Sequence, residues 1–519
     1  YQDTVGASIY NARLECVVHG VGTEMGTFEP GWLESQRLLR HLYCINWVQA
    51  DNGPPISTGD CVCLSTVNKG LCDAQPASSS LTSYSTILLA TWSSCVQPLC
   101  TVTTALALVQ SQAASTKLSE VWLVHGLNLG GMADDGLRGL ARSLRQEWQA
   151  PLRHTEMRTK SDMHVLMAVV YHLPREQEVI QLDNCLLAAR LTTLPRAASV
   201  TRSVGGSHLL TGGLGGLGLL TARWLVTQGA TALLLASRSG RVASAGTYEW
   251  SLLQSDRAEV LLQCCDIGDQ IDARRSSTAL WGGSAPQMGG ACHMAGVLAD
   301  ALLAQQAEKG MRTVYAPKVF GACALQSVCV CAALCSFVLF SSVAALLGNS
   351  GQANYSAANA CVDALATARS ACGVVSASVQ WGPWAQVGMA ANDKVVARMQ
   401  ASGVGMIGMM EGVLALRRTL QWRNPAVVAV LPVQWDRLHQ SATEVPALLT
   451  GLAPRLQCGS TSVVEAIRSV LELETVLELV CRTAGGSVDA DIPLMDAGLD
   501  SLGAVELNRQ LQVAVGGGV

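Results

Sequence analysis

Short apolar runs alternate with stretches of helical periodicity along most of this chain. In the first half, apolar and β-branched runs at residues 43–48, 86–89 and 121–125 are predicted strands, and residues 134–148 are predicted to be helical. From residue 206 the alternation continues, with predicted strands at residues 208–210, 232–237, 259–265, 290–294, 337–340, 374–379 and 427–431. This alternation indicates an α/β fold with two tandem Rossmann-like units, each a doubly wound parallel sheet.

Changes in this pattern divide the chain into five segments. Residues 1–41 show no clear periodicity and are predicted to be the tail of an upstream domain or a linker. The two α/β units are expected at residues 42–205 and 206–440, and only the second has a glycine-rich loop. Residues 441–460 have the composition of a linker, and residues 461–519 return to a helical period.

The overall composition excludes several classes of protein. The 519 residues carry a net charge of −4, which argues against binding to nucleic acid or to a membrane surface. The first residues lack the basic and apolar regions of a signal peptide and also lack an initiator methionine. We therefore expect a fragment of a cytoplasmic protein.

One uncharged segment, residues 319–362, contains a stretch at residues 327–348 that is apolar enough to resemble a membrane span. Ser-Ser and Gly-Asn-Ser-Gly interrupt it, which favours a helix, a buried parallel strand and a loop. No membrane contact is predicted.

The 19 cysteines are scattered and often lie in apolar runs, so we expect buried free thiols rather than disulfides. Cys329, Cys331 and Cys335 do not have the spacing of zinc ligands, and no histidine lies near them. No metal site is predicted.

A glycine-rich sequence, LLTGGLGGLG at residues 209–218, opens the second α/β unit. Gly213, Gly215 and Gly218 have G-x-G-x-x-G spacing, which permits a tight turn, close approach of backbone N–H groups to a pyrophosphate and close packing of the next helix. Alone the motif is weak evidence, because glycine-rich turns are common. Its place between a predicted strand and a predicted helix indicates dinucleotide binding.

Four polar residues downstream have an order and spacing that suit reduction of a carbonyl group. Ser342 lies upstream of Tyr355, Asn359 follows Tyr355 by one helical turn, and Lys318 precedes all three. A tyrosine can donate the proton, a serine hydroxyl can bind the carbonyl oxygen, and a lysine ammonium can lower the pKa of the tyrosine. With the glycine loop, these residues predict a nicotinamide-dependent carbonyl reductase.

In these residues the chain resembles the ketoreductase domains of modular polyketide synthases, members of the short-chain dehydrogenase/reductase superfamily. Ordinary members of that superfamily have a lysine one helical turn after the tyrosine; here that position is Asn359 and the lysine is Lys318, the exchange typical of polyketide and animal fatty-acid synthase ketoreductases. The matching segments occur in family order: TGGLGGLG at 211–218, SRSG at 237–240, CDIGD at 265–269, HMAGVLADALL at 293–303, PKVFGA at 317–322, FSSVAALLGNSGQANYSAANACVDALA at 340–366 and WGPW at 381–384.

The resemblance implies a reaction and partners. A β-ketoacyl thioester on an acyl carrier protein would be reduced to the β-hydroxyacyl thioester during polyketide chain extension. The other synthase domains, a ketosynthase and an acyltransferase, would be partners within a homodimeric synthase. Residues 42–204 would form the family's structural subdomain, a degenerate copy of the reductase fold that supports the catalytic half.

The sequence also bears on the choice of cofactor. The second predicted strand of the catalytic unit ends in Arg238 where an NAD-binding site would have an acidic residue, and an arginine suits a 2′-phosphate, so NADPH is expected. By resemblance, Asp266 and Ile267 flank the adenine. The full predicted cofactor set is Thr211, Gly212, Gly213, Leu214, Gly215, Gly218, Ser237, Arg238, Asp266, Ile267, Ala295 and Gly296.

Two further residues bear on stereochemistry by resemblance. Ketoreductases that form the B-type alcohol usually carry a Leu-Asp-Asp motif at a fixed distance before the catalytic lysine, and Asp300 stands where its second aspartate would be relative to Lys318. The first aspartate is replaced by Ala299, and the tryptophan that marks A-type enzymes is replaced by Gln352. A B-type, D-configured product is expected.

The last motif, DAGLDSLGAVELNRQLQ at residues 496–512, resembles the attachment site of acyl carrier proteins. Ser501 would carry 4′-phosphopantetheine, although a serine before a helix is also an ordinary N-cap. Residues 461–519 match only the first half of such a domain. Two other interpretations of the whole chain remain open: the equivalent segment of a type I fatty-acid synthase, and an inactive scaffold domain.

Overall fold

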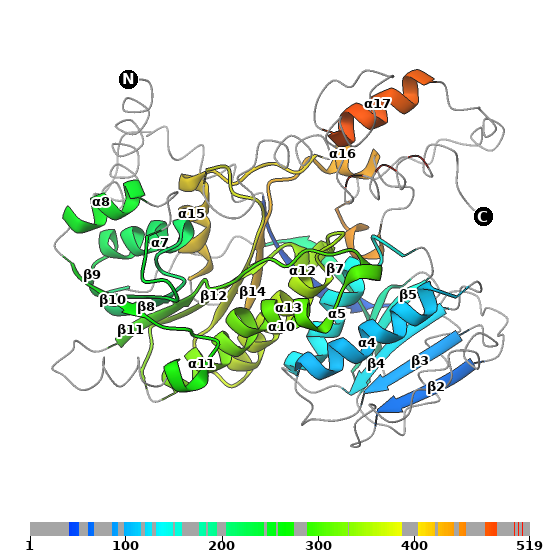
Figure 1. Ribbon diagram of the computed structural model, residues 1–519, viewed down its shortest axis with the longest axis horizontal. Coiled ribbons are helices and arrows are strands. Elements are labelled where there is room, and N and C mark those ends of the chain that lie inside the picture. Colours follow the sequence, from blue (N-terminus) through cyan, green and yellow to red (C-terminus); the bar gives the residue numbers. More distant parts are fainter. Residues whose placement is uncertain are drawn as a thin grey trace.

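One continuous β-sheet runs through the described part of the chain (Figure 1). Its strand order is β10-β9-β8-β11-β12-β13-β14-β1-β7-β6-β5-β4-β3-β2, so both predicted α/β units contribute to the same sheet. The structure, a computed structural model, describes residues 41–50, 61–66, 86–91, 98–115, 120–126, 131–148, 151–157, 176–182, 185–194, 204–242, 247–255, 258–273, 288–330, 332–386, 403–420, 424–440, 446–452 and 473–484, and the single positions 503, 507 and 511.

The second half is a parallel sheet whose strand order reverses between β8 and β11, the kind of switch point at which doubly wound sheets bind ligands. Strands β11 and β12 are apolar and almost wholly buried, as expected for central parallel strands. Its strands are β8 (Gly206–Thr211), β9 (Ala230–Ser237), β10 (Glu259–Cys264), β11 (Met288–His293), β12 (Ser336–Ser342), β13 (Ala377–Trp381) and β14 (Val427–Val430).

All seven strands predicted for this half are present, with shifted ends. The largest shift is at β13, which was expected to start at residue 374 but begins at Ala377. A turn at Cys372 and Gly373 ends α13, and the Val374 N–H donates to the Arg369 carbonyl of that helix instead of joining the sheet. The helices of this half are α7 (Gly216–Thr227), α8 (Thr247–Ser255), α10 (Glu308–Tyr315), α11 (Gly321–Val328), α12 (Ala344–Leu347), α13 (Ala353–Ala371), α15 (Met409–Thr419) and α16 (Trp435–Gln440).

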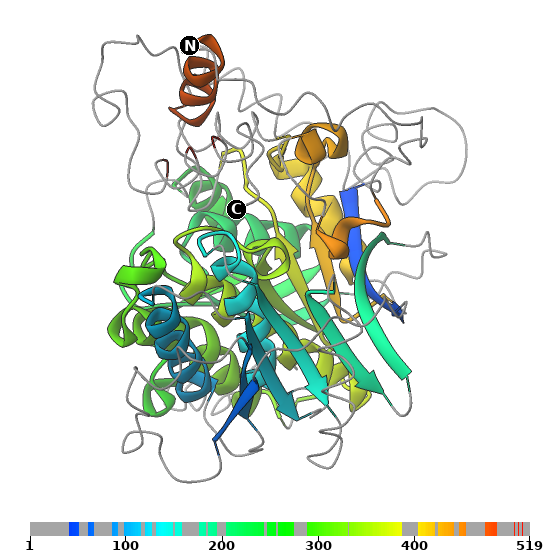
Figure 2. The same cartoon turned by 90° about the vertical axis from the view of Figure 1, so that its right-hand side faces the viewer.

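In the first half, five parallel strands follow one another across the sheet in chain order. Only two residues separate β6 from β7, too few for a parallel crossover, so these strands pair antiparallel. Strand β1 (Leu42–Gln49) pairs antiparallel with β7 and with β14 and so joins the two halves (Figure 2). The remaining elements are β2 (Cys61–Thr66), β3 (Thr86–Thr91), α4 (Pro98–Ala113), β4 (Glu120–Gly126), α5 (Met132–Leu144), β5 (Leu152–Met157), β6 (Glu178–Leu182) and β7 (Cys185–Thr193).

Helix α5 of the first half packs tightly against α13 of the second. A Cβ atom at Gly139 would lie 2.4 Å from the Ser356 carbonyl oxygen, and one at Gly136 would lie 2.8 Å from the Cys361 sulfur. Glycine at both positions therefore lets the two helix backbones approach closely. Leu137 and Leu140 share a buried apolar cluster with Ala357 and Cys361 of α13, so the predicted supporting role of this half has a physical basis.

The segment that resembled a membrane span forms α11 and the buried strand β12, as predicted, and the short helix α12 where a loop was expected. Among the described residues, no helix is both long enough and apolar enough to cross a membrane. The cysteines that the structure describes are free thiols, and Cys329 is buried among apolar side chains.

Candidate active site

The glycine loop connects β8 to α7 at the switch point of the sheet. Gly212 has a φ of +71°, and a Cβ atom there would lie 2.8 Å from the Ala295 nitrogen. A Cβ at Gly218 would lie 2.4 Å from the Gly212 carbonyl oxygen, whereas one at Gly215 would meet nothing closer than 3.3 Å. Glycine at 212 thus permits the turn, and glycine at 218 permits the helix to pack against it. Gly215 has more room and lies at the start of α7, where the first N–H groups have no partner within the helix.

Arg238 and Ser237 lie directly beyond the turn, at the end of the neighbouring strand β9. The Arg238 side chain is exposed. Among the described residues, its guanidinium has no hydrogen-bond or ion-pair partner. The Ser237 hydroxyl accepts the Gly240 N–H at 3.2 Å and shapes the turn after the strand. An exposed cation at this strand end fits the predicted 2′-phosphate contact.

The other predicted cofactor residues line the ends of β10 and β11. Asp266 is exposed, and its carboxylate accepts the Gly268 N–H at 3.0 Å. Ile267 is buried with Ala273 and Ala324, and Ala295 packs against that cluster. A Cβ atom at Gly296 would lie 2.9 Å from Lys318 Cε, so Gly296 connects this group to the predicted catalytic residues.

The four predicted catalytic residues come from three elements that meet at this end of the sheet. Tyr355 and Asn359 lie one turn apart on α13, and the Asn359 amide donates to the Tyr355 carbonyl oxygen at 2.8 Å. Ser342 ends β12, and its hydroxyl accepts the Ala344 N–H at 3.2 Å. Lys318 is buried in a π-helical turn, Ala316–Phe320, between α10 and α11. Such turns often occur at functional sites.

Tyr355 is buried, and burial raises its pKa above the ordinary value of 10.0. Hydrogen bonds with the side chains of Asn359 and Ser342 act in the opposite direction and lower the pKa. The sequence predicted a lowered pKa under the influence of the lysine, and the described site differs because loss of hydration outweighs the hydrogen bonds. The proton therefore stays on Tyr355 at neutral pH, the form that a proton donor needs.

The Lys318 ammonium donates to the Phe340 carbonyl oxygen at 3.0 Å. Burial lowers its pKa from 10.5 to about 8, and the negative charge of Asp363 acts in the opposite direction. Asp363 accepts hydrogen bonds from Ser378 at 2.6 Å and Gln380 at 2.8 Å, and burial raises its pKa to about 6. Sequence reasoning missed Asp363, although its position one helical turn after Asn359 places these two residues on the same face of α13.

His293 is a second residue that sequence reasoning left without a role. It lies at the end of β11, and its Nε2–H donates to the Lys318 carbonyl oxygen at 2.9 Å. Nδ1 must then accept from the Thr211 hydroxyl, 2.7 Å away, because burial lowers the pKa of His293 to about 3 and keeps the ring neutral. The histidine thus ties the turn that bears Lys318 to the strand before the glycine loop.

The two predicted stereocontrol residues are in direct contact. The Gln352 amide donates to Asp300 Oδ2 at 3.0 Å, and the Asn349 amide donates to Gln352 Oε1 at 2.9 Å. Burial raises the pKa of Asp300, while the bond from Gln352 lowers it. The Asp300 charge in turn raises the pKa of Tyr355, so this pair adjoins the predicted proton donor.

The predicted attachment residue, Ser501, lies outside the described residues. In the C-terminal segment the structure describes α17 (Leu473–Ala484), and Val480 of this helix packs against Leu507 in a small apolar cluster. The predicted tail at residues 1–41 is described only at its last position, His41.

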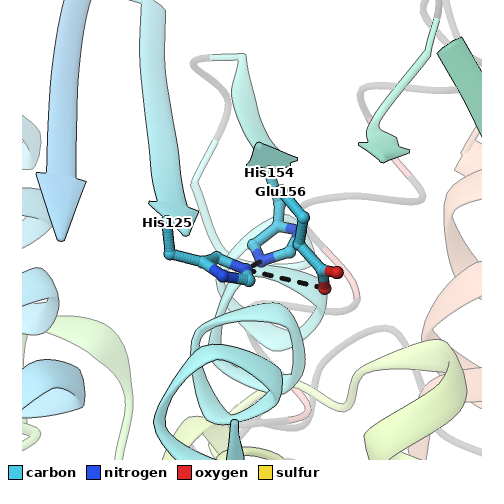
Figure 3. A group of neighbouring side chains, drawn as sticks. All are labelled: His125, His154 and Glu156. Atoms are coloured by element: carbon cyan, nitrogen blue, oxygen red, sulfur yellow. Dashed lines mark hydrogen bonds and ion pairs between the residues drawn. The ribbon is translucent and has the colours of Figure 1, made fainter. Parts of the chain in front are cut away.

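A cluster of His125, His154 and Glu156 lies on the neighbouring strands β4 and β5 of the first half (Figure 3). The two Nε2 atoms are 2.7 Å apart, and His125 Nε2 lies 3.6 Å from Glu156 Oε1. Their donor types and spacing would permit a metal ion, but Arg138 pairs with Glu156, and burial together with nearby positive charges holds the pKa of His154 well below 6.5. The guanidinium already neutralises the one carboxylate, so the surroundings favour a hydrogen-bonded structural cluster over a cation site.

Comparisons with known protein families divide the chain in two. Residues 206–386 match the KR domain, and residues 472–518 match the phosphopantetheine attachment site. Polyketide synthase GfsA of Streptomyces halstedii is 32% identical over 373 residues, 66% of this chain. A phenolphthiocerol synthesis polyketide synthase of Mycobacterium tuberculosis whose name marks it as inactive is 34% identical over 354 residues, 62% of this chain. The chain spans 5% and 22% of the length of these two relatives.

Solved structures give the same picture of the fold. The ketoreductase from the first module of phoslactomycin biosynthesis in Streptomyces sp. HK803 is 25% identical, with a TM-score of 0.68 over 80% of this chain and 99% of that one. An A1-type ketoreductase is 22% identical, with a TM-score of 0.71 over 80% of this chain and 98% of that one. Both halves of the described sheet therefore belong to a known architecture.

Proposed function

Residues 206–386 are a KR domain and residues 472–518 a phosphopantetheine attachment domain of the polyketide synthase type, and from that premise we propose a reaction for this chain. It reduces a carrier-bound β-ketoacyl thioester to the β-hydroxyacyl thioester with NADPH during polyketide chain extension. The observation that carries the proposal is the meeting of Tyr355, Ser342 and Asn359 beside Lys318, which in turn contacts Gly296 near the glycine loop.

Tyr355 is the proton donor in this proposal. Its raised pKa keeps the phenol protonated at neutral pH, and the side chains of Ser342 and Asn359 lie close enough to lower that pKa in part. The Ser342 hydroxyl can bind the carbonyl oxygen of the substrate and stabilise the negative charge that develops there. Lys318 adds a positive charge nearby, held in place by the Phe340 carbonyl.

The residues around the glycine loop fit a dinucleotide. A side chain at Gly212 or Gly218 would collide with backbone, so glycine preserves the tight turn into α7, whose first N–H groups could bind a pyrophosphate. Arg238 is exposed at the end of β9 and could bind a 2′-phosphate. When bound, NADPH supplies the hydride. Asp266 and Ile267 would hold the adenine end, and Ala295 and Gly296 would lie beside the nicotinamide end.

The reaction is tested by following NADPH absorbance with a simple β-ketoacyl thioester. We expect the full chain to oxidise NADPH only when the thioester is present, and Tyr355→Phe to lower the rate at least ~100-fold with little change in NADPH affinity, since the ring packing remains. Tyr248→Phe, on the exposed face of α8, is the matched control and should match the unaltered chain. No oxidation by the unaltered chain would favour the inactive scaffold.

The contact between Asp300 and Gln352 supports a B-type outcome as the finer proposal. Chiral analysis of the alcohol tests it, with a predominantly D-configured product expected. A predominantly L-configured product would overturn the assignment without affecting the proposed reduction.

The C-terminal segment would carry 4′-phosphopantetheine on Ser501 and so present the substrate in the parent synthase. Incubation with a phosphopantetheinyl transferase and coenzyme A should add one phosphopantetheine mass, and Ser501→Ala should not accept it. Absence of the added mass from the unaltered chain would show that this segment is not loaded.

A further inference from the structure

Two loops near Tyr355 carry the predicted stereocontrol residues Asp300 and Gln352, here called the stereocontrol pair. One loop runs from Asp300 to Leu303, and the other ends at Gly351 and Gln352 before α13 begins. The loops are joined directly, because the Ala301 N–H donates to the Gly351 carbonyl oxygen at 2.8 Å. The Gln306 amide reinforces this junction by donating to the Ala301 carbonyl oxygen at 2.7 Å.

A carboxylate from the first half of the chain binds both loops. Glu147 follows α5, and its Oε1 accepts the Gly351 N–H at 2.7 Å while its Oε2 accepts the Leu303 N–H at 2.5 Å. Both bonds are charge-assisted, and the Glu147 side chain is half-buried, so solvent competes with them only in part. Burial raises the pKa of Glu147, and the two backbone N–H groups lower it, as expected for a carboxylate that they stabilise.

Further contacts from the first half converge on the same loops. The Gln110 amide of α4 donates to the Leu303 and Gln306 carbonyl oxygens, both at 2.8 Å. The Ser143 hydroxyl accepts the Asn349 N–H at 3.0 Å, and Asn349 in turn binds Gln352. The half of the chain that carries no predicted catalytic residue therefore fixes the backbone on both sides of the stereocontrol pair.

We propose that Glu147 is a positioning residue for stereospecificity: its carboxylate clamps the loops of Asp300 and Gln352 together and so fixes the side from which the substrate enters. This inference rests on the proposed reduction. Glu147 belongs to the first half of the chain and bonds to neither side chain of the pair. Its effect passes through Leu303 and Gly351, whose positions determine where the pair can lie.

The test compares Glu147→Gln with the unaltered chain in a β-ketoacyl thioester reduction. A glutamine can accept only one of the two N–H groups and presents N–H donors to the other, so one loop is released. We expect the ratio of the two alcohol enantiomers to fall about ten-fold, as the loss of one charge-assisted bond implies, while NADPH affinity stays within two-fold. Glu120→Gln, which removes an ion pair with Arg153 elsewhere in the first half, should leave the ratio unchanged.

Hydrogen–deuterium exchange separates failure of this inference from failure of the proposed function. Peptides that contain Leu303 and Gly351 should exchange faster in Glu147→Gln than in the unaltered chain, whether or not either reduces the thioester. Unchanged exchange, or an unchanged enantiomer ratio in an active variant, would overturn the clamp. If Glu147→Gln does not fold, Gln110→Ala provides the second test, and it should lower the ratio in the same direction but less, because Glu147 still joins the two loops.

Discussion

Replacing Lys318 with methionine should stabilise the folded chain at neutral pH. Lys318 is 3% exposed, and burial lowers its pKa from 10.5 to about 8. Keeping the ammonium charged at pH 7 therefore costs the folded state about 3 kcal/mol. Methionine has a similar length and no charge, so this cost disappears in Lys318→Met.

The substitution also removes one favourable contact. The Phe340 carbonyl oxygen loses the hydrogen bond from Lys318 Nζ, which costs roughly 1 kcal/mol. The expected net gain is thus about 2 kcal/mol in the free energy of unfolding at pH 7. A residue proposed to assist the reaction would then be one that destabilises the fold, as is common at active sites.

The sign of the pH dependence follows from the direction of the pKa change. The pKa of Lys318 is lower in the folded than in the unfolded chain, so the cost of its charge is complete below pH 8 and declines as the pH rises from about 8 to 10.5. The advantage of Lys318→Met should therefore shrink by about 2 kcal/mol between pH 7 and pH 9.5.

Equilibrium urea unfolding at the two pH values, followed by tryptophan fluorescence, measures both quantities. Trp381 and Trp384 pack in the core of the catalytic half and report its unfolding. Lys309→Met is the matched control, because Lys309 is exposed on α10. A variant less stable than the unaltered chain at pH 7, or a difference that does not change with pH, would refute the reasoning.

Three further substitutions test other parts of the site. Arg238→Ala should raise the KM for NADPH at least ~10-fold and leave the KM for NADH nearly unchanged, because only NADPH has a 2′-phosphate for Arg238 to bind. Steady-state kinetics with both cofactors measures this, and equal effects on the two KM values would exclude the phosphate contact. Gly218→Ala places a methyl group 2.4 Å from the Gly212 carbonyl oxygen, so it should displace the glycine loop and weaken NADPH binding ~10-fold or more. Fluorescence titration measures the affinity, and an unchanged value would contradict the proposed role of the glycine loop in binding NADPH. Ser342→Ala should lower kcat about 100-fold, close to 3 kcal/mol, with unchanged NADPH affinity, and a change confined to affinity would argue against a role at the carbonyl oxygen.

Periodicity and short motifs were enough to predict the strands and the glycine loop of the second half. Each strand there is a short apolar run next to a helix, and the glycine spacing marks a turn that a side chain would block. The exchange of Asn359 and Lys318 selected residues on α13 and on the π-helical turn, two elements that lie apart in the sequence and are in contact in the structure. These signals are local or belong to a motif, which is why a single sequence reveals them.

The joining of the two halves could not be predicted in the same way. No local pattern shows that β1 pairs with β14, the last strand of the second half. Nor does it show that the lack of a side chain at Gly139 allows α5 to pack closely against Ser356. The roles of Glu147, Asp363 and His293 depend on long-range hydrogen bonds that a linear pattern does not encode. The raised pKa of Tyr355 likewise follows from burial, which the spacing of the motif does not reveal.

Isotope transfer tests the central claim most directly. The full chain is incubated with a β-ketoacyl thioester and NADPH that carries deuterium at the transferable C4 position, and the thioester product is examined by mass spectrometry. The account predicts a β-hydroxyacyl product one deuterium heavier at the former ketone carbon, and at least ~100-fold less of it with Tyr355→Phe. An unlabelled alcohol, no alcohol, or equal labelling by Tyr355→Phe would contradict the claim that this site reduces a β-ketone with Tyr355 as proton donor.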